Sequence, residues 1–453
     1  MKNKELTRKI GARILSEAND LKRTISTMAK EINYEENKIN LIINGECELE
    51  DSYSLIKEMG EKYSIDIADL LLMQTDCDNS VKIMRSTESI KSSRVYNRLN
   101  RDKINSPYYE YRDTAMSAMS PFKPEWIKQL RVVNNNDPLN PDIVYNNGHF
   151  MHQTTFFVGP VNFYYEINGK KFCQEMNTGD SNYITPYWPH SFASRDKSQE
   201  AFIVAITFGA DVRRAQKELY ELGYRSKDYI LEIRNRNKAI KSLIKQHMMN
   251  EHMNIHHMKK IAEKELISID LEEMVFGEKT IDLENLKKIA IILNIEVTDL
   301  LISTYNPEEE VVIRKRKEGN RYLFPDDNNA VYQIETLARA TKMPLMKSFS
   351  INVLKDELDH NLSSSLHTYI YNYGDSDVSV SWQVNGKIFN NIIKKNDSLY
   401  MQPFLKHGFS CKDKDGKLFV VRVSGSVNLS TQREMSYFAN IDRFFNETEC
   451  WFD

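Results

Sequence analysis

The chain has 453 residues and a mass of 53.0 kDa, which is more than one hydrophobic core usually organises, so we expect several domains. Charged residues make up 28% and hydrophobic residues 41%, a balance that excludes a disordered or fibrous protein. The 61 Lys and Arg nearly balance the 64 Asp and Glu, which excludes a chain that binds nucleic acid mainly by neutralising phosphates.

The cysteines indicate a reducing compartment. There are five of them, they are scattered, and none forms a CxxC pair: Cys47, Cys77, Cys173, Cys411 and Cys450. This pattern favours free thiols over a disulfide framework, so we expect a cytoplasmic protein. The charged start MKNKELTRKIGARIL, and the lack of any run near the ~18 apolar residues of a membrane helix, predict neither an export signal nor a membrane anchor.

Two kinds of pattern follow one another twice along the chain. Residues 1–75 have apolar residues at helical spacings, and 76–230 contain aromatic and β-branched runs such as TTFFVGPVNFYYEING, which are typical of antiparallel strands. A helical pattern returns over 231–305 and strands over 306–453. Because the segments 43–71 and 275–301 also match in order and character, we predict an α+β protein built from a duplicated helical-plus-strand unit.

The segment TISTMAKEINYEENKINLIINGE resembles the helix-turn-helix of phage-repressor-type regulators, which would imply DNA binding. Residues 1–75, however, contain 11 Lys and Arg against 14 Asp and Glu, and the helix that would read DNA offers Glu35, Glu36 and a single cation, Lys38. Phosphates would repel such a helix. We therefore expect a helix-turn-helix-like scaffold without a DNA partner.

A candidate metal site lies in the first strand region. Residues four apart on one strand face the same side, so His149 and Gln153 in GHFMHQ can point to one interior position while His152 faces outward. A third donor is His190 in TPYWPHS, next to prolines that restrain the backbone. Three convergent ligands would leave positions open for a substrate.

These residues resemble the two metal motifs of the cupin superfamily, whose fold is a double-stranded β-helix barrel. Asn147-Gly148-His149, three residues, Gln153 and Gly159 match the first motif, although Asn147 replaces its first His and Gln153 its Glu. Gly179 through His190 match the second motif. The resemblance implies a cupin barrel in each unit, with a metal site in the first.

Over nearly its whole length the chain is similar to the non-haem iron family of 2-hydroxyethylphosphonate dioxygenases and methylphosphonate synthases. The segments NNGH and GDSNYITPYWPHS carry this resemblance. In the dioxygenase branch the iron carboxylate precedes the second His by six residues, where this chain has Ile184, which cannot bind metal. The synthase branch uses a Gln at the position of Gln153. The resemblance thus implies Fe(II) held by His149, Gln153 and His190.

An uncharged amide in place of a carboxylate would leave a ferrous site about one charge more positive, which favours an anionic ligand such as a phosphonate. Zinc hydrolysis is a weaker alternative because no general base is evident. The resemblance implies cleavage of 2-hydroxyethylphosphonate by O2 to methylphosphonate and bicarbonate or CO2. The alternatives are the dioxygenase reaction, which gives hydroxymethylphosphonate and formate, and a cupin-linked transcription regulator.

The resemblance also assigns residues to the substrate. Arg101 and Tyr111 in RDKINSPYYEYRDTA are expected at the phosphonate, with Tyr109 as a substitute for Tyr111, and Asn146 matches a substrate-binding Asn. Lys22 is expected to reach over the site from the helical region as part of a lid. The sequence leaves a homo-oligomer open.

The second strand region has a reduced set of these residues. His367 and His407 correspond in the sequence to His149 and His190, but Tyr371 stands for Gln153 and Met401 for Ile184. Two His alone specify iron weakly. We expect a degenerate barrel without a metal.

Overall fold

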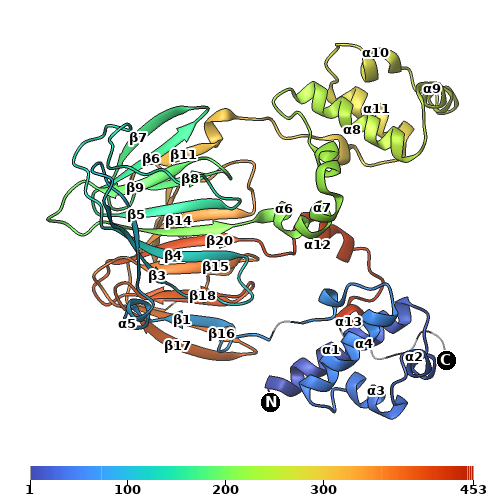
Figure 1. Cartoon of the computed structure of the whole chain (residues 1–453), viewed down its shortest axis with the longest axis horizontal. Helices are drawn as coiled ribbons and strands as arrows, with labels where there is room; N and C mark the ends of the chain where they lie inside the picture. The colour runs from blue at the N-terminus through green and yellow to red at the C-terminus, as the bar shows by residue number, and fades with distance from the viewer. Residues whose placement is uncertain are drawn as a thin grey trace.

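Two rounds of helices followed by strands make up the chain (Figure 1). A computed structural model describes residues 2–72, 74–358, 360–445, 447, 449 and 451; Cys450 lies outside them. The first helices are α1 (Lys2–Asp20), α2 (Ile25–Glu31), α3 (Glu36–Ile43) and α4 (Leu49–Lys62). Their apolar faces meet in one buried cluster that includes Ile10, Ile14, Ile39 and Leu55. Burial of these residues at helical spacings explains why the segment folds as a bundle.

A second bundle has its own apolar cluster. It comprises α8 (Arg236–Asn250), α9 (Ile255–Lys264), α10 (Leu271–Phe276) and α11 (Leu283–Leu293). The remaining helices are short: α5 (Ser86–Lys91), α6 (Ala210–Arg214), α7 (Gln216–Leu222), α12 (Leu429–Met435) and α13 (Ile441–Phe445). Among the helices described, none has both the length and the apolar character that crossing a membrane requires.

The strands form two larger and two smaller antiparallel sheets. One seven-stranded sheet runs β11-β8-β5-β10-β4-β3-β2. Its strands are β2 (Arg94–Leu99), β3 (Asn105–Asp113), β4 (Phe122–Gln129), β5 (His152–Val158), β8 (Ser181–Ile184), β10 (Phe202–Phe208) and β11 (Val311–Arg314). A three-stranded sheet, β7-β6-β9, contains β6 (Val161–Ile167), β7 (Lys170–Met176) and β9 (His190–Ser194).

The other two sheets repeat this plan. The second seven-stranded sheet runs β1-β18-β15-β20-β14-β13-β12. Its strands are β1 (Val81–Met84), β12 (Arg321–Phe324), β13 (Tyr332–Thr336), β14 (Met346–Val353), β15 (His367–Asn372), β18 (Ser398–Met401) and β20 (Gly416–Val423). Its small partner, β17-β16-β19, contains β16 (Val378–Val384), β17 (Lys387–Ile393) and β19 (Lys406–Ser410).

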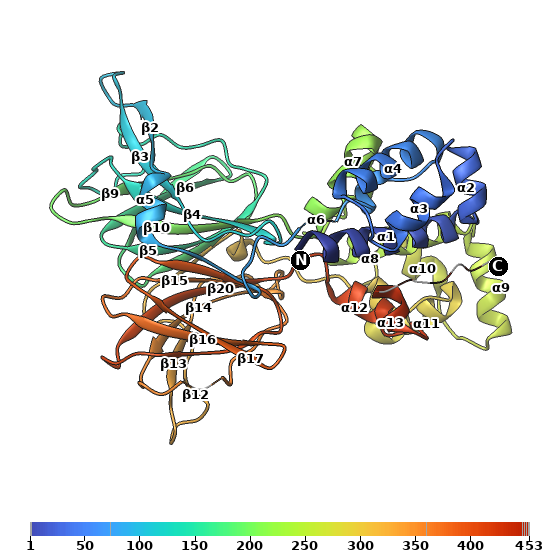
Figure 2. The ribbon, with the colours of Figure 1, turned by 90° about the horizontal axis from the view of Figure 1, so that it is seen from below.

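The two large sheets pack face to face, while the two helical bundles lie to one side of the sheets and the short helix α5 lies against the strands (Figures 1 and 2). Aromatic side chains fill the central interface, among them Phe156 and Phe419, whose stacked rings lie 4.7 Å apart. Separate apolar clusters lie between each large sheet and its small partner. Both faces of the large sheets are therefore buried, which explains the nearly continuous apolar run of β10.

Each large sheet takes its first strand from the other half of the chain. β1 opens the first strand region but pairs with β18 of the second, with Val81 opposite Met401. β11 opens the second strand region but pairs with β8, with Val311 opposite Ile184. The two strand regions are thus interlocked by an exchange of strands.

Candidate active site

His149 lies in an irregular segment just before β5, whereas the sequence predicted that it shares a strand with Gln153. Gly148 makes this segment possible: its φ is +71°, and a Cβ there would come within 2.3–2.6 Å of the backbone of Tyr187. The Tyr187 amide also donates to the His149 carbonyl at 2.9 Å. The loop before β9 therefore fixes the position of His149.

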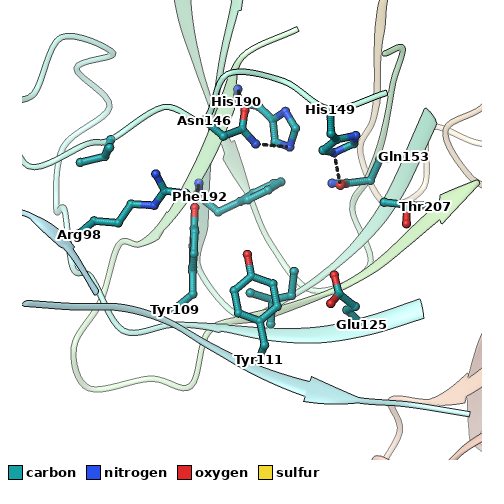
Figure 3. A pocket seen from close by; sticks show the side chains of 12 residues that line it. Arg98, Tyr109, Tyr111, Glu125, Asn146, His149, Gln153, His190, Phe192 and Thr207 are labelled. Atoms are coloured by element: carbon teal, nitrogen blue, oxygen red, sulfur yellow. Dashed lines mark hydrogen bonds between the residues drawn. The ribbon is translucent and has the colours of Figure 1, made fainter. Parts of the chain in front are cut away.

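Gln153 is oriented by a neighbour on its own strand, β5. Its side-chain nitrogen donates to Thr155 Oγ1 at 2.9 Å, and its Oε1 lies 3.2 Å from His149 Nε2 (Figure 3). In the sheet register Gln153 stands opposite Ile184 on one side and Thr207 on the other. Directly opposed residues share a face, so Ile184 occupies the interior beside the amide. Ile184 is fully buried in an apolar cluster and offers no ligand atom.

His190 begins β9 and completes a set of three donors. Its Nδ1 donates to the Trp188 carbonyl at 2.9 Å, and the Asn146 side-chain nitrogen donates to its Nε2 at 3.1 Å. The two imidazoles, His149 and His190, lie 5.1 Å apart at 90°. Burial lowers the pKa of His190 to about 4, so the ring is neutral at physiological pH. A neutral imidazole is the form that binds a metal.

The donor set fits a divalent metal. His149 Nδ1 donates to the Met151 carbonyl at 2.8 Å, as His190 Nδ1 does to its own carbonyl partner, so both Nε2 atoms carry lone pairs toward the cavity. A metal bound at His190 Nε2 would take the place of the Asn146 side-chain nitrogen there. Two ligands at right angles around a metal at about 2.1 Å would be about 3.0 Å apart, close to the 3.2 Å between His149 Nε2 and Gln153 Oε1. Within the described residues there is no cluster of three His, Cys, Asp or Glu, so no carboxylate joins the two histidines.

These donors line a cavity of about 120 Å³, large enough for a small molecule (Figure 3). The other residues around it are Arg98, Tyr109, Tyr111, Glu125, Ile127, Val144, Asn146, Phe192 and Thr207. Of the substrate contacts predicted from the sequence, Tyr111 and Asn146 are brought to the cavity. Tyr111 Oη has no hydrogen-bond partner among the described residues, and burial raises its pKa to about 12, so it remains a donor. Tyr109 also lines the cavity, where its hydroxyl accepts from the Phe192 amide at 2.8 Å and lies 3.1 Å from Ser191 Oγ.

Arg101 and Lys22 do not reach the cavity within this chain. Arg101 is exposed in the turn after β2, and its Nε donates to Asp142 at 2.7 Å. Lys22 follows α1; its Nζ donates to the Asp20 carbonyl at 3.2 Å and lies 5.0 Å from the centre of the Trp451 ring.

Two charged cavity residues were not anticipated from the sequence. Arg98 lines the cavity from β2 and forms no ion pair with a described residue. Glu125 lines it from β4, 3.3 Å from Arg94, and burial raises the pKa of this carboxyl. Alternation along PFKPEWIKQ places Glu125 on the same face of the strand as Ile127. This alternation is the sequence signal by which Glu125 could have been found.

Strand register also corrects the sequence alignment of the second strand region. His367 lies opposite Val423, as His152 lies opposite Phe208, so His367 is equivalent to His152 rather than to His149. Its Nδ1 contacts Tyr400 Oη at 2.6 Å, as that of His152 contacts Tyr183 Oη at 2.8 Å.

The same register identifies the other equivalents. Thr368, not Tyr371, takes the place of Gln153, because Thr368 stands opposite Met401 as Gln153 stands opposite Ile184. His407 does correspond to His190, since His190 stands opposite Tyr165 of β6 as His407 stands opposite Trp382 of β16, and each donates from Nδ1 to a carbonyl at 2.9 Å.

Comparison with known proteins places the chain among phosphonate enzymes. No family model matches it. It is 37% identical over 451 residues to methylphosphonate synthase from Nitrosopumilus maritimus (strain SCM1), a match that covers 98% of this chain and 95% of that protein.

Solved structures agree with this match. Streptomyces albus HEPD, solved with 2-hydroxyethylphosphonate and Fe(II) bound, matches with a TM-score of 0.89 and 28% identity, covering 98% of this chain and 99% of that one. A variant of 2-hydroxyethylphosphonate dioxygenase shares the fold with a TM-score of 0.76 at 16% identity, covering 96% and 99% of the two chains. On the identity and coverage of the curated relative, the chain belongs to the methylphosphonate synthase family.

Proposed function

We propose that this chain is an Fe(II)-dependent methylphosphonate synthase that cleaves the carbon–carbon bond of 2-hydroxyethylphosphonate with O2. The observation that carries the proposal is the Gln153 amide oxygen beside His149 Nε2, with the apolar Ile184 at the opposing position. Family membership and the neutral His190 ring support the same assignment. Bound Fe(II) would supply the activation of dioxygen and the oxidation of the substrate.

Other residues of the cavity can bind an anionic substrate. Arg98 offers a guanidinium that forms no ion pair within the described part of the chain, which suits the two-point recognition of a phosphonate. Tyr111 offers a hydroxyl donor. Asn146 accepts from the His190 amide at 2.9 Å through its oxygen. Its side-chain nitrogen, which donates to His190 Nε2 here, would turn to the substrate once a metal occupies that atom. Together, Arg98, Tyr111 and Asn146 would orient the substrate beside the metal ligands.

The reaction balances without an external reductant. 2-Hydroxyethylphosphonate and O2 together contain the atoms of methylphosphonate, CO2 and water, and all four electrons taken up by O2 come from the substrate. The carbinol carbon is oxidised to CO2 or bicarbonate, and the carbon bonded to phosphorus gains a hydrogen. The sister reaction, to hydroxymethylphosphonate and formate, has the same atom balance, so product analysis separates the two.

Phosphorus NMR of reactions under air and under nitrogen tests the proposal directly. The Fe(II)-loaded chain should convert 2-hydroxyethylphosphonate to methylphosphonate only with oxygen present. The matched variant Gln153→Ala should form little product while keeping its thermal stability. Hydroxymethylphosphonate as the main product would contradict the synthase assignment, and no oxygen-dependent product would contradict the enzyme class.

We also infer that the helical bundles are helix-turn-helix-like scaffolds and the paired sheets are two cupin barrels, with domains over 1–75, 76–230, 231–305 and 306–453. The repeated sheet order supports the barrel assignment. Lys38, the one cation on the helix that would read DNA, is paired with Asp51 at 2.7 Å, which supports a scaffold role. The free thiols of Cys47, Cys77, Cys173 and Cys411 fit the cytoplasmic location expected from the sequence.

A further inference from the structure

Strand register relates interior residues of the second strand region to those of the catalytic one. Tyr332 Oη accepts from the Phe409 amide at 2.8 Å, as Tyr109 Oη accepts from the Phe192 amide at 2.8 Å. With this register, the place of the catalytic cavity can be followed into the second half. The residues found there have a different chemistry.

Arg422 takes the place of Thr207. It stands opposite Thr368, whereas Thr207 stands opposite Gln153. Its guanidinium lies 4.9 Å from the centre of the Phe349 ring, and Phe349 is the register equivalent of Glu125. The second half thus gains a fixed cation where the first half has a hydroxyl, and loses the nearby carboxylate.

This cation is partly buried and has no counterion. No carboxylate of the described residues pairs with Arg422, and its Nε is buried without a hydrogen-bond partner. Burial lowers the pKa of Arg422 to about 10, the direction expected of a cation that lacks an anion. A stacked arginine in the first half, Arg112, lies 4.1 Å from the Trp126 ring but has Glu110 at 2.6 Å. Buried charges are normally paired, so the difference points to a ligand.

His407 supplies a second unpartnered group at the same place. It is 3% exposed, and its Nε2 is buried without a hydrogen-bond partner. Because its Nδ1 donates to the Leu405 carbonyl at 2.9 Å, the neutral ring presents a lone pair at Nε2. Arg422 takes the place of Thr207 and His407 that of His190, two residues that both line the catalytic cavity, so the register brings Arg422 and His407 to the same interior position. A water molecule between them would satisfy two hydrogen bonds but not the positive charge.

We propose that the second barrel binds a small, monoprotonated tetrahedral oxyanion of the phosphate or phosphonate class. Its anionic oxygens accept from Arg422, and its P–OH donates to His407 Nε2. The arginine charge takes the part that the metal ion plays in the first barrel, so this site needs no metal. One histidine and one arginine make a poor metal site but complementary partners for a hydrogen phosphate.

Calorimetric titration of the full-length, iron-free chain with inorganic phosphate tests the proposal. Wild type should bind one phosphate, and Arg422→Gln should bind it at least about tenfold more weakly. Arg321→Gln is the matched control, because Arg321 lies in the same barrel but is already paired with Glu335 at 2.8 Å; its phosphate affinity should equal that of wild type. Arg98→Gln should also retain binding, and loss of binding in that variant alone would place the phosphate in the first cavity and overturn the proposal.

Two further arms complete the design. If Arg422→Gln loses cooperative thermal unfolding, Arg422→Lys and His407→Phe replace it, and each should weaken phosphate binding while the chain stays folded. The titration is repeated with 2-hydroxyethylphosphonate: competition with phosphate would identify the substrate class as a ligand, and its absence would identify free phosphate. No heat from either anion at millimolar concentration would overturn the site.

Discussion

Replacing Thr155 with valine tests how the metal-binding amide is held. Thr155 Oγ1 accepts from Gln153 Nε2 at 2.9 Å, which turns Oε1 toward His149. Valine has nearly the same shape but cannot accept. The buried amide nitrogen then either stays unsatisfied, at a cost of about 1–3 kcal/mol, or rotates and presents a donor to the metal. Because 1.4 kcal/mol is a factor of about ten, we expect Fe(II) to bind roughly 10–100-fold more weakly, the range for residues that orient a metal ligand.

Anaerobic competition with a chromophoric chelator measures this Fe(II) affinity. Thr154→Val is the matched control: both threonines are fully buried on β5, but Thr154 faces the other side, where its hydroxyl donates to the Asn182 carbonyl at 3.2 Å. This control should bind iron like wild type. An iron affinity of Thr155→Val within about twofold of the Thr154→Val value would refute the reasoning.

Three other substitutions test the site from different sides. Ile184→Glu buries a carboxylate opposite Gln153, so the iron-free variant should melt below wild type and regain part of the difference on Fe(II) binding, as followed by calorimetry; equal losses with and without iron would argue against a shared ligand position. Glu310→Ala removes hydrogen bonds that hold the loop before β9. Burial raises the pKa of the Glu310 carboxyl, but hydrogen bonds from the Thr185 hydroxyl and the Trp188 indole have the larger combined effect, so the pKa is lowered. Its stabilisation is therefore present above the ordinary pKa of 4.5 and lost as the pH falls through the lower folded value, so the melting difference from wild type should shrink below pH 4.5, and a pH-independent difference would contradict this. Tyr111→Phe should raise KM for 2-hydroxyethylphosphonate about tenfold and leave Fe(II) affinity unchanged; a weaker iron site instead would show that Tyr111 supports the metal.

The sequence predicted which residues come together at the site better than it predicted the backbone conformation around them. The structure brings His149, Gln153 and His190 to one cavity because the segment before β5, β5 itself and the start of β9 meet there. The assumed shared strand for His149 is wrong, because a positive-φ glycine and the contact with Tyr187 replace strand geometry there. Local patterns do not report such a contact between distant loops.

The other errors in the sequence-based prediction arose because strand pairing between distant segments cannot be read from local patterns. Arg98 and Glu125 became visible only through strand register, and resemblance alone selected Arg101 in a segment where the chain has extra residues. The alignment of His367 failed for the same reason, because the loops before the two strands differ in length while both strands contain a histidine.

The exchanged strands make each half a structural component of the other. Expressed alone, residues 76–230 would lack β11, leaving the fully buried β8 as an uncovered hydrogen-bonding edge prone to self-association. Glu310, just before β11, would also be missing, and with it the partner of Trp188 in the loop that positions His190. An evolutionary loss of the non-catalytic half would thus dismantle the catalytic half, which explains how a copy without a complete metal centre can be retained.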